Sequence, residues 1–396
     1  YYNLPIATII KKGSKDDKAV YNNKIAVALK YAELGGTEPL DLSKISKDNL
    51  ITLNDLKTVT TAADLKAKVD ALADNSGIPS SFDGKTFVLT TGVDAGKDFT
   101  GTNKGDLFIA DNSVAGTVNA SAADTLDGGK GVDTFKLYDT TVTTAELPTL
   151  KNIENVVIYD NTSTVNLTKW DTVETLFLVR EAAAHTYTLG EKVTTVNIED
   201  TLAASAPILK FDNAVAAATI DVNKVGVAGT AATVTVDSAA TAALKTLTIN
   251  ASGKASNVIL DQNTTDTIET LNITGRADLT LAYATPAGGA GNSKIATIDG
   301  SKAQGKLDLD LDNTDAATLK TVKTGTGDDT VTLNGLSVVY GATINLGAGN
   351  DKLVQGTAGT IAAGSIIDGG AGIDSLDSAL VTVGNAGVFA SFETIS

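Results

Sequence analysis

Apolar and polar residues alternate along most of this chain, from about residue 82 to residue 396. A short phrase recurs in this region with one apolar residue at its centre. The steps between these central residues are 20, 20, 24, 27, 24, 27 and 24, for Val156, Leu176, Val196, Ile220, Leu247, Leu271, Ile298 and Val322. A second strand-like stretch lies between successive phrases, for example 164–167 and 233–236. Alternation with period two is typical of strands, and a repeat of about 24 residues is typical of one solenoid coil.

One coil of this size cannot bury its apolar face alone, so neighbouring coils must stack to form a core. The pattern therefore predicts a mainly β protein, a parallel β-solenoid over residues 81–396. The first 80 residues differ, because 14–34 and 61–72 carry apolar side chains at helical spacing. We expect a short helical segment over 1–80. The sequence starts at Tyr1 and contains no methionine, so we expect this segment to be the end of a larger N-terminal domain.

Glycine–aspartate turns interrupt the alternation at two places. Three copies of Gly-x-Gly-x-Asp-x-apolar lie near the C-terminal end, where Asp329, Asp351 and Asp374 are 22 and 23 residues apart. A fourth copy, 128–135, contains Asp133, and a looser turn at 99–108 contains Asp106. Glycines allow tight turns in which several carbonyl oxygens point at one spot. Carbonyl and carboxylate oxygens together suit calcium, and two stacked turns can supply the six or more ligands that one turn cannot.

These turns resemble the Gly-Gly-x-Gly-x-Asp-x-apolar-x nonapeptide of RTX proteins, which forms calcium-bound parallel β-helices. The copies at 128–135 and 369–376 match it in full, whereas Thr324 and Leu346 replace the first glycine of the other two. The period of 22 to 23 residues differs from the nine of RTX arrays and predicts longer coils with a calcium turn on one edge only. We expect calcium turns near 98–135 and 323–377 and metal-poor coils over 147–322.

The expected cofactor is Ca²⁺. Its candidate ligands are side-chain or backbone oxygens of Gly101, Asn103, Asp106, Asp127, Gly129, Gly131, Asp133, Gly325, Gly327, Asp329, Gly347, Gly349, Asp351, Asp368, Gly370, Gly372, Asp374 and Asp377. Because the turns stack, Asp351 is expected to be shared between two inter-coil sites. Asp308, Asp310 and Asp312 alternate along one strand face; they are either solvated or bind calcium at a contact between molecules.

Composition excludes several other functions. The chain has 47 acidic and 31 basic residues and a formal charge of −16, so nucleic acid is not an expected partner. It has no cysteine and one histidine, His185, which leaves no residues for a zinc site or a nucleophilic dyad. No run of about 18 apolar residues occurs, so no transmembrane segment is expected. The acids form no distinguished catalytic pair, and we do not expect an enzyme.

The resemblance extends to calcium-binding surface-layer (S-layer) proteins of Gram-negative bacteria. It implies a structural protein, exported by type I secretion, that self-assembles into a two-dimensional lattice on the cell surface. It also implies cell-surface lipopolysaccharide as a partner, bound through a missing N-terminal part. An RTX adhesin or interaction module of a large secreted protein is an alternative, as is, more remotely, a secreted polysaccharide-acting enzyme.

Overall fold

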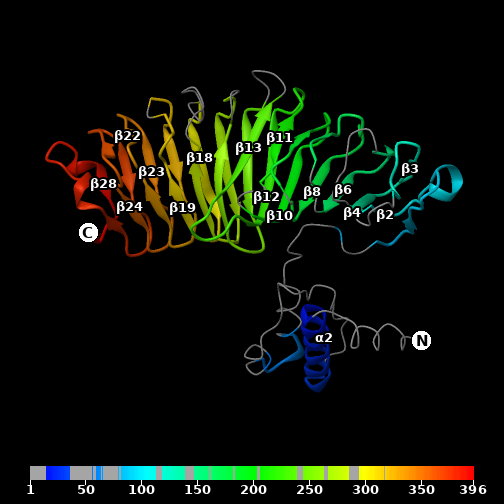
Figure 1. Cartoon of the computed structure of the whole chain (residues 1–396). Coiled ribbons are helices and arrows are strands. Elements are labelled where there is room, and N and C mark those ends of the chain that lie inside the picture. Colours follow the sequence, from blue (N-terminus) through cyan, green and yellow to red (C-terminus); the bar gives the residue numbers. More distant parts are fainter. Residues whose placement is uncertain are drawn as a thin grey trace. The chain divides into compact units, whose positions relative to one another are not determined.

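The computed structural model divides into two compact units, Tyr1–Ser80 and Ser81–Ser396, each described here by itself (Figure 1). The described residues are 15–35, 56, 59–63, 65, 79, 82–112, 118–138, 147–159, 161, 163–181, 183–202, 206–238, 244–262, 266–284, 294–315 and 317–396.

In the first unit, helix α2 (Lys15–Glu33) matches the expected helix over 14–34. Its buried residues Val27 and Tyr31 form a small cluster with Leu56, Val59 and Leu65. The second expected helix, 61–72, lies largely outside the described residues. Within the part of the chain that the structure describes, no helix is long and apolar enough to cross a membrane.

The second unit is a parallel β-solenoid, as predicted, built mainly from two long sheets (Figure 1). In order across the 14-stranded sheet, the strands are β1 (Thr86–Val88), β2 (Leu107–Asp111), β4 (Thr134–Tyr138), β6 (Asn155–Tyr159), β8 (Thr175–Val179), β10 (Thr195–Thr201), β12 (Ala217–Val225), β14 (Thr246–Ala251), β16 (Thr270–Gly275), β18 (Thr297–Ala303), β20 (Thr321–Lys323), β23 (Thr343–Asn345), β26 (Ile366–Asp368) and β28 (Phe389–Ala390). Neighbouring strands in this sheet are parallel, for example β2 with β4 and β23 with β26.

The 11-stranded sheet forms the other long wall. Its strands are β7 (Val165–Asn166), β9 (Thr186–Thr188), β11 (Ile208–Phe211), β13 (Ala232–Ser238), β15 (Ser256–Asp261), β17 (Leu279–Tyr283), β19 (Leu307–Asp310), β21 (Thr330–Thr332), β24 (Lys352–Val354), β27 (Ser375–Leu376) and β29 (Thr394–Ile395). Two smaller sheets pair β3 (Thr125–Asp127) with β5 (Thr149–Lys151), and β22 (Ser337–Val338) with β25 (Thr360–Ile361). Short 3₁₀ helices are η2 (Gly96–Phe99), η4 (Ser378–Leu380) and η5 (Ala386–Val388).

The recurring phrases of the sequence are the strands of the 14-stranded sheet, and their central residues form a buried column. Val156 pairs with Leu176 and Leu176 with Val196. Further along, Leu271 pairs with both Leu247 and Ile298. These side chains belong to one continuous apolar core that runs through the stacked coils.

One step of the column differs from the phrase alignment. Ile220 pairs with Ile249, while Leu247 pairs with Ala218, so the register between β12 and β14 is shifted by two residues. A shift of two leaves every side chain on its original face, because side chains alternate with period two. The apolar pattern therefore fits both registers equally well and cannot choose between them.

The stacked core predicts a sharp contrast between neighbouring residues on β16. Leu271 is fully buried between two coils, so Leu271→Ala should lower the free energy of unfolding by about 2–5 kcal/mol. Thr270 is half-buried, and β16 places it on the opposite face; Thr270→Ala should change stability by roughly 0.5 kcal/mol. Denaturant unfolding of both variants checks this, and equal losses would contradict the assigned inward and outward faces.

Candidate metal sites

Three of the predicted aspartates stack at one edge of the solenoid, which confirms the expected column. Asp329, Asp351 and Asp374 directly precede β21, β24 and β27. Oδ1 of Asp351 accepts a hydrogen bond from the backbone N–H of Asp329 (2.7 Å), and Oδ1 of Asp374 accepts one from the N–H of Asp351 (2.7 Å). All three are at most 1% exposed. Each carboxylate therefore links its own coil to the preceding one.

The N-terminal turns repeat this link. Asp106 and Asp133 directly precede β2 and β4, and both are fully buried. Oδ1 of Asp133 accepts from the N–H of Asp106 at 2.6 Å, and Oδ1 of Asp106 accepts from the N–H of Lys85.

The two groups of turns lie at opposite edges of the 14-stranded sheet. Asp106 and Asp133 lie just before strands of that sheet, whereas the turn that contains Asp329 follows β20 and leads into the 11-stranded sheet. Because the strands are parallel, the start and the end of a strand mark opposite edges. Each coil of the two arrays has its glycine–aspartate turn on one edge only, but that edge differs between the two ends of the solenoid.

Each aspartate column ends on a glutamate that the sequence reasoning did not assign to the site. Oε2 of Glu154 accepts from the N–H of Asp133 (2.8 Å), and Oε2 of Glu393 accepts from the N–H of Asp374 (2.8 Å). Both glutamates lie in the coil that follows the last glycine–aspartate turn. The sequence contains one signal for these two glutamates: an apolar residue followed by Glu, in Ile-Glu-Asn and Phe-Glu-Thr, occurs one coil after each array of glycine–aspartate turns.

In two turns both oxygens of the aspartate have partners. Oδ2 of Asp106 accepts from the N–H of Thr102 (2.5 Å) and from its hydroxyl (2.9 Å). Oδ2 of Asp329 accepts from the N–H of Gly325 (3.0 Å), and the Thr324 hydroxyl lies beside this carboxylate. Each oxygen of these two carboxylates therefore has a protein hydrogen-bond partner.

In the other three turns one carboxylate oxygen is buried without a hydrogen-bond partner: Oδ2 of Asp133, Asp351 and Asp374. At Asp351 the cause is local, because the N–H of Gly347 donates to Asn345 Oδ1 (3.0 Å) and not to the aspartate. Gly347 has φ +87°, a conformation suited to glycine. The corresponding bonds in the other two turns join Gly129 to Asp127 and Gly370 to Asp368, both at 3.1 Å.

Burial makes two of these carboxylates costly to ionise. It raises the pKa of Asp133 to about 7, and the negative charges of Glu154 and Asp106 raise it further, against the hydrogen bond from the Asp106 N–H. Burial likewise raises the pKa of Asp351 to about 7, with Asp329 and Asp374 as the nearest repelling charges. A cation beside the column would lower the cost of ionising these groups.

Glycines allow a carbonyl oxygen of the next coil to come close beside two of the free oxygens. A Cβ atom added to Gly369 would collide with the carbonyl oxygen of Ser391 and lie 3.0 Å from Asp374 Oδ2. A Cβ atom added to Gly128 would collide with the Asn152 carbonyl oxygen and with Asp133 Oδ2. A carboxylate oxygen and a carbonyl oxygen of the next coil therefore lie beside the same glycine, where no side chain could be accommodated. This oxygen-only surrounding fits a hard cation such as calcium.

Backbone oxygens must supply most ligands of any such ion. Among the described residues, no three acidic, histidine or cysteine side chains form a group that could hold a metal ion. The second glycines of the C-terminal turns pack directly against a carbonyl of the preceding coil: a Cβ atom on Gly349 would collide with the Gly327 carbonyl, and one on Gly372 with the Gly349 carbonyl.

The remaining predicted residues occupy other positions. Gly101, Asn103, Asp127 and Gly129 line one surface hollow, in which Asp127 Oδ1 also accepts from the Asn152 amide (2.8 Å). Asp377 lies outside the aspartate column. Its oxygens accept from the N–H groups of Gln355 and Ala379, both at 3.0 Å, and the second bond caps η4. Gly131 packs against the backbone of Lys104.

The acidic strand β19 is partly occupied by internal bonds. Asp308 and Asp310 are half-buried and Asp312 is exposed. Asp310 accepts from the N–H of Asp312 (3.0 Å) and from the Asn334 amide (2.8 Å). This leaves Asp308 and Asp312 as the more available carboxylates for contacts with another molecule.

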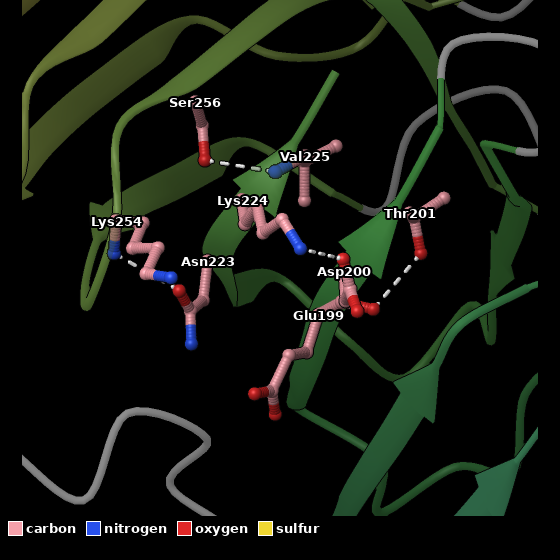
Figure 2. Close-up of polar contacts among 8 residues, drawn as sticks. All are labelled: Glu199, Asp200, Thr201, Asn223, Lys224, Val225, Lys254 and Ser256. Atoms are coloured by element: carbon pink, nitrogen blue, oxygen red, sulfur yellow. Dashed lines mark hydrogen bonds and ion pairs between the residues drawn. The ribbon is translucent and has the colours of Figure 1, made fainter. Parts of the chain in front are cut away.

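Corners in the middle coils use other contacts (Figure 2). Lys224 Nζ lies 2.5 Å from Asp200 Oδ1 on the neighbouring coil, and both residues have left-handed φ values. Asn223 Oδ1 accepts from the N–H of Lys254 (3.0 Å), and Ser256 Oγ accepts from that of Val225 (3.1 Å). Neutral side chains and an ion pair thus join these coils, and a half-exposed pair contributes little to stability.

No protein-family model matches the chain, and no curated protein sequence matches it.

The glutamate that ends the N-terminal column gives a direct test of the inter-coil link. Glu154→Ala removes a charged acceptor from the buried N–H of Asp133 and should cost about 1.5–3 kcal/mol. Glu174 lies one coil further, beside Glu154, and is exposed; Glu174→Ala should cost roughly 0.5 kcal/mol or less. Chemical denaturation distinguishes the two, and equal costs would show that Glu154 does not cap the column.

Proposed function

We propose that this chain is a calcium-stabilised structural protein that assembles into a surface layer outside a bacterial cell. The observation that carries the calcium part is the set of three buried carboxylate oxygens without partners, on Asp133, Asp351 and Asp374. Buried polar atoms in folded proteins are nearly always hydrogen-bonded or bound to an ion. The resemblance to RTX surface-layer proteins supplies the biological role.

Calcium binding also supports secretion in the unfolded state. The chain has a formal charge of −16, and the aspartates within each column repel one another when no cation is present. At the low calcium concentration of the cytosol the turns would be destabilised, as type I export requires. Outside the cell, calcium binds the folded state and stabilises it by mass action.

Self-association is the part of the proposal that gives the lattice. Acidic molecules approach one another only with cations between them, and Asp308 and Asp312 on and after β19 are candidate bridging residues. Lipopolysaccharide remains the proposed anchor. We propose no catalytic activity.

Removing calcium should destabilise the solenoid. Excess chelator should lower the melting temperature by several degrees or more, because binding energy contributes to folding. Magnesium should not restore it, since carbonyl-rich turns suit calcium's loose coordination better than strict octahedral geometry. Circular dichroism melts with calcium, magnesium and chelator measure this effect. Identical melting temperatures in calcium and in chelator would contradict a structural role for the metal.

Assembly is tested separately by electron microscopy of the whole protein. With calcium in the millimolar range, the range of weak extracellular sites of about 10⁻⁴–10⁻³ M, we expect two-dimensional sheets. Asp308→Asn with Asp312→Asn should reduce sheet formation and leave the melting temperature unchanged. A protein that stays monomeric at every calcium concentration, on bare and lipopolysaccharide-coated grids, would favour the adhesin over the surface layer.

A further inference from the structure

We propose that only the turns of Asp133, Asp351 and Asp374 bind calcium, and that threonine side chains close the turns of Asp106 and Asp329 to the ion. This inference rests on the proposed function, since it assigns calcium to particular turns. It departs from the sequence motif, which marks all five aspartates as ligands.

The closed turns share one device. Thr324 is 2% exposed. Its hydroxyl donates its one proton to the Leu346 carbonyl of the next coil, and the Asp329 carboxylate is the alternative acceptor of that proton. The same two types of oxygen lie beside Gly369, where a carbonyl oxygen of Ser391 and Oδ2 of Asp374 approach the glycine and no hydroxyl lies between them. In the Asp106 turn, Thr102 supplies both its hydroxyl and its N–H to Oδ2.

The open turns share the opposite arrangement. Six residues before each aspartate lies Asp127, Asn345 or Asp368, whose side chain accepts the N–H that would otherwise reach the carboxylate. Neither threonine nor any other hydroxyl residue lies four or five residues before these aspartates. At the corresponding positions of the Asp329 turn lie Lys323 and Thr324. These two positions thus decide whether a carboxylate oxygen stays free.

Two matched substitutions should have opposite effects. Asp374→Asn retains the side-chain oxygen that accepts the N–H of Asp351 and replaces the free oxygen by an NH₂ group. The calcium-free melting temperature should fall little, and the chain should bind one calcium ion fewer. In the unaltered chain both carboxylate oxygens of Asp329 accept backbone N–H groups. In Asp329→Asn, the amide NH₂ group must replace one of these oxygens in either orientation, so it faces another N–H donor. The calcium-free melting temperature should fall clearly, and the number of bound ions should not change.

A substitution that adds a calcium site tests the same inference without disrupting a turn. Lys323→Asp with Thr324→Gly gives the third turn from the C-terminal end the sequence pattern of the turns at Asp133 and Asp374. We expect one additional calcium ion per chain. Lys320→Asp makes the same charge change beside β20, on an exposed residue away from the turn, and should add none.

Isothermal titration of the whole chain with calcium, together with melts in chelator, measures both quantities. The inference predicts three ions for the unaltered chain, two for Asp374→Asn, three for Asp329→Asn and four for the double substitution. Equal loss of calcium in Asp374→Asn and Asp329→Asn, or no gain in the double substitution, would overturn it and leave the proposed function standing. An unaltered chain that binds no calcium would overturn both.

Discussion

Every glycine–aspartate turn in this solenoid buries a carboxylate, and each of its two oxygens needs a partner there. One oxygen is satisfied in the same way throughout, by a backbone N–H of the preceding coil, as between Asp329 and Asp351. Buried carboxylates without full hydrogen bonding are costly, so the second oxygen is decisive. Where a threonine supplies the partner, the turn is complete as protein alone. Where it does not, the second oxygen is buried without a hydrogen-bond partner among the described residues.

This requirement also explains how the arrays end. The backbone N–H of the last aspartate in each column needs an acceptor from the next coil, which has no motif aspartate. The longer side chains of Glu154 and Glu393 reach these N–H groups and accept their hydrogen bonds. Beyond Glu154 the coils are joined by neutral side chains and pairs such as Lys224 with Asp200, over a continuous apolar core. The solenoid thus combines middle coils without glycine–aspartate turns and two arrays of such turns, on opposite edges of one sheet, that bury carboxylate oxygens without hydrogen-bond partners.

Much of this architecture could be predicted from the sequence, because burial imposes periodicity. The apolar phrases identified the strands of the long sheet, and the 22- and 23-residue spacing identified the stack of Asp329, Asp351 and Asp374. The register of β12 against β14 could not be predicted, since a two-residue shift preserves the pattern. Nor could the glutamate caps or the free oxygens, because both depend on which N–H group each carboxylate meets. Thr324 was read as a missing glycine, whereas its hydroxyl bonds the carboxylate that the motif assigns to calcium.

The most direct test of this account is a crystal structure of the chain grown with calcium, with anomalous diffraction recorded at a long wavelength. The account predicts anomalous peaks beside Oδ2 of Asp133, Asp351 and Asp374, the oxygens that lack protein partners, and no peak beside Asp106 or Asp329. A peak of equal height at Asp329, or no peak at the three open turns, would contradict it.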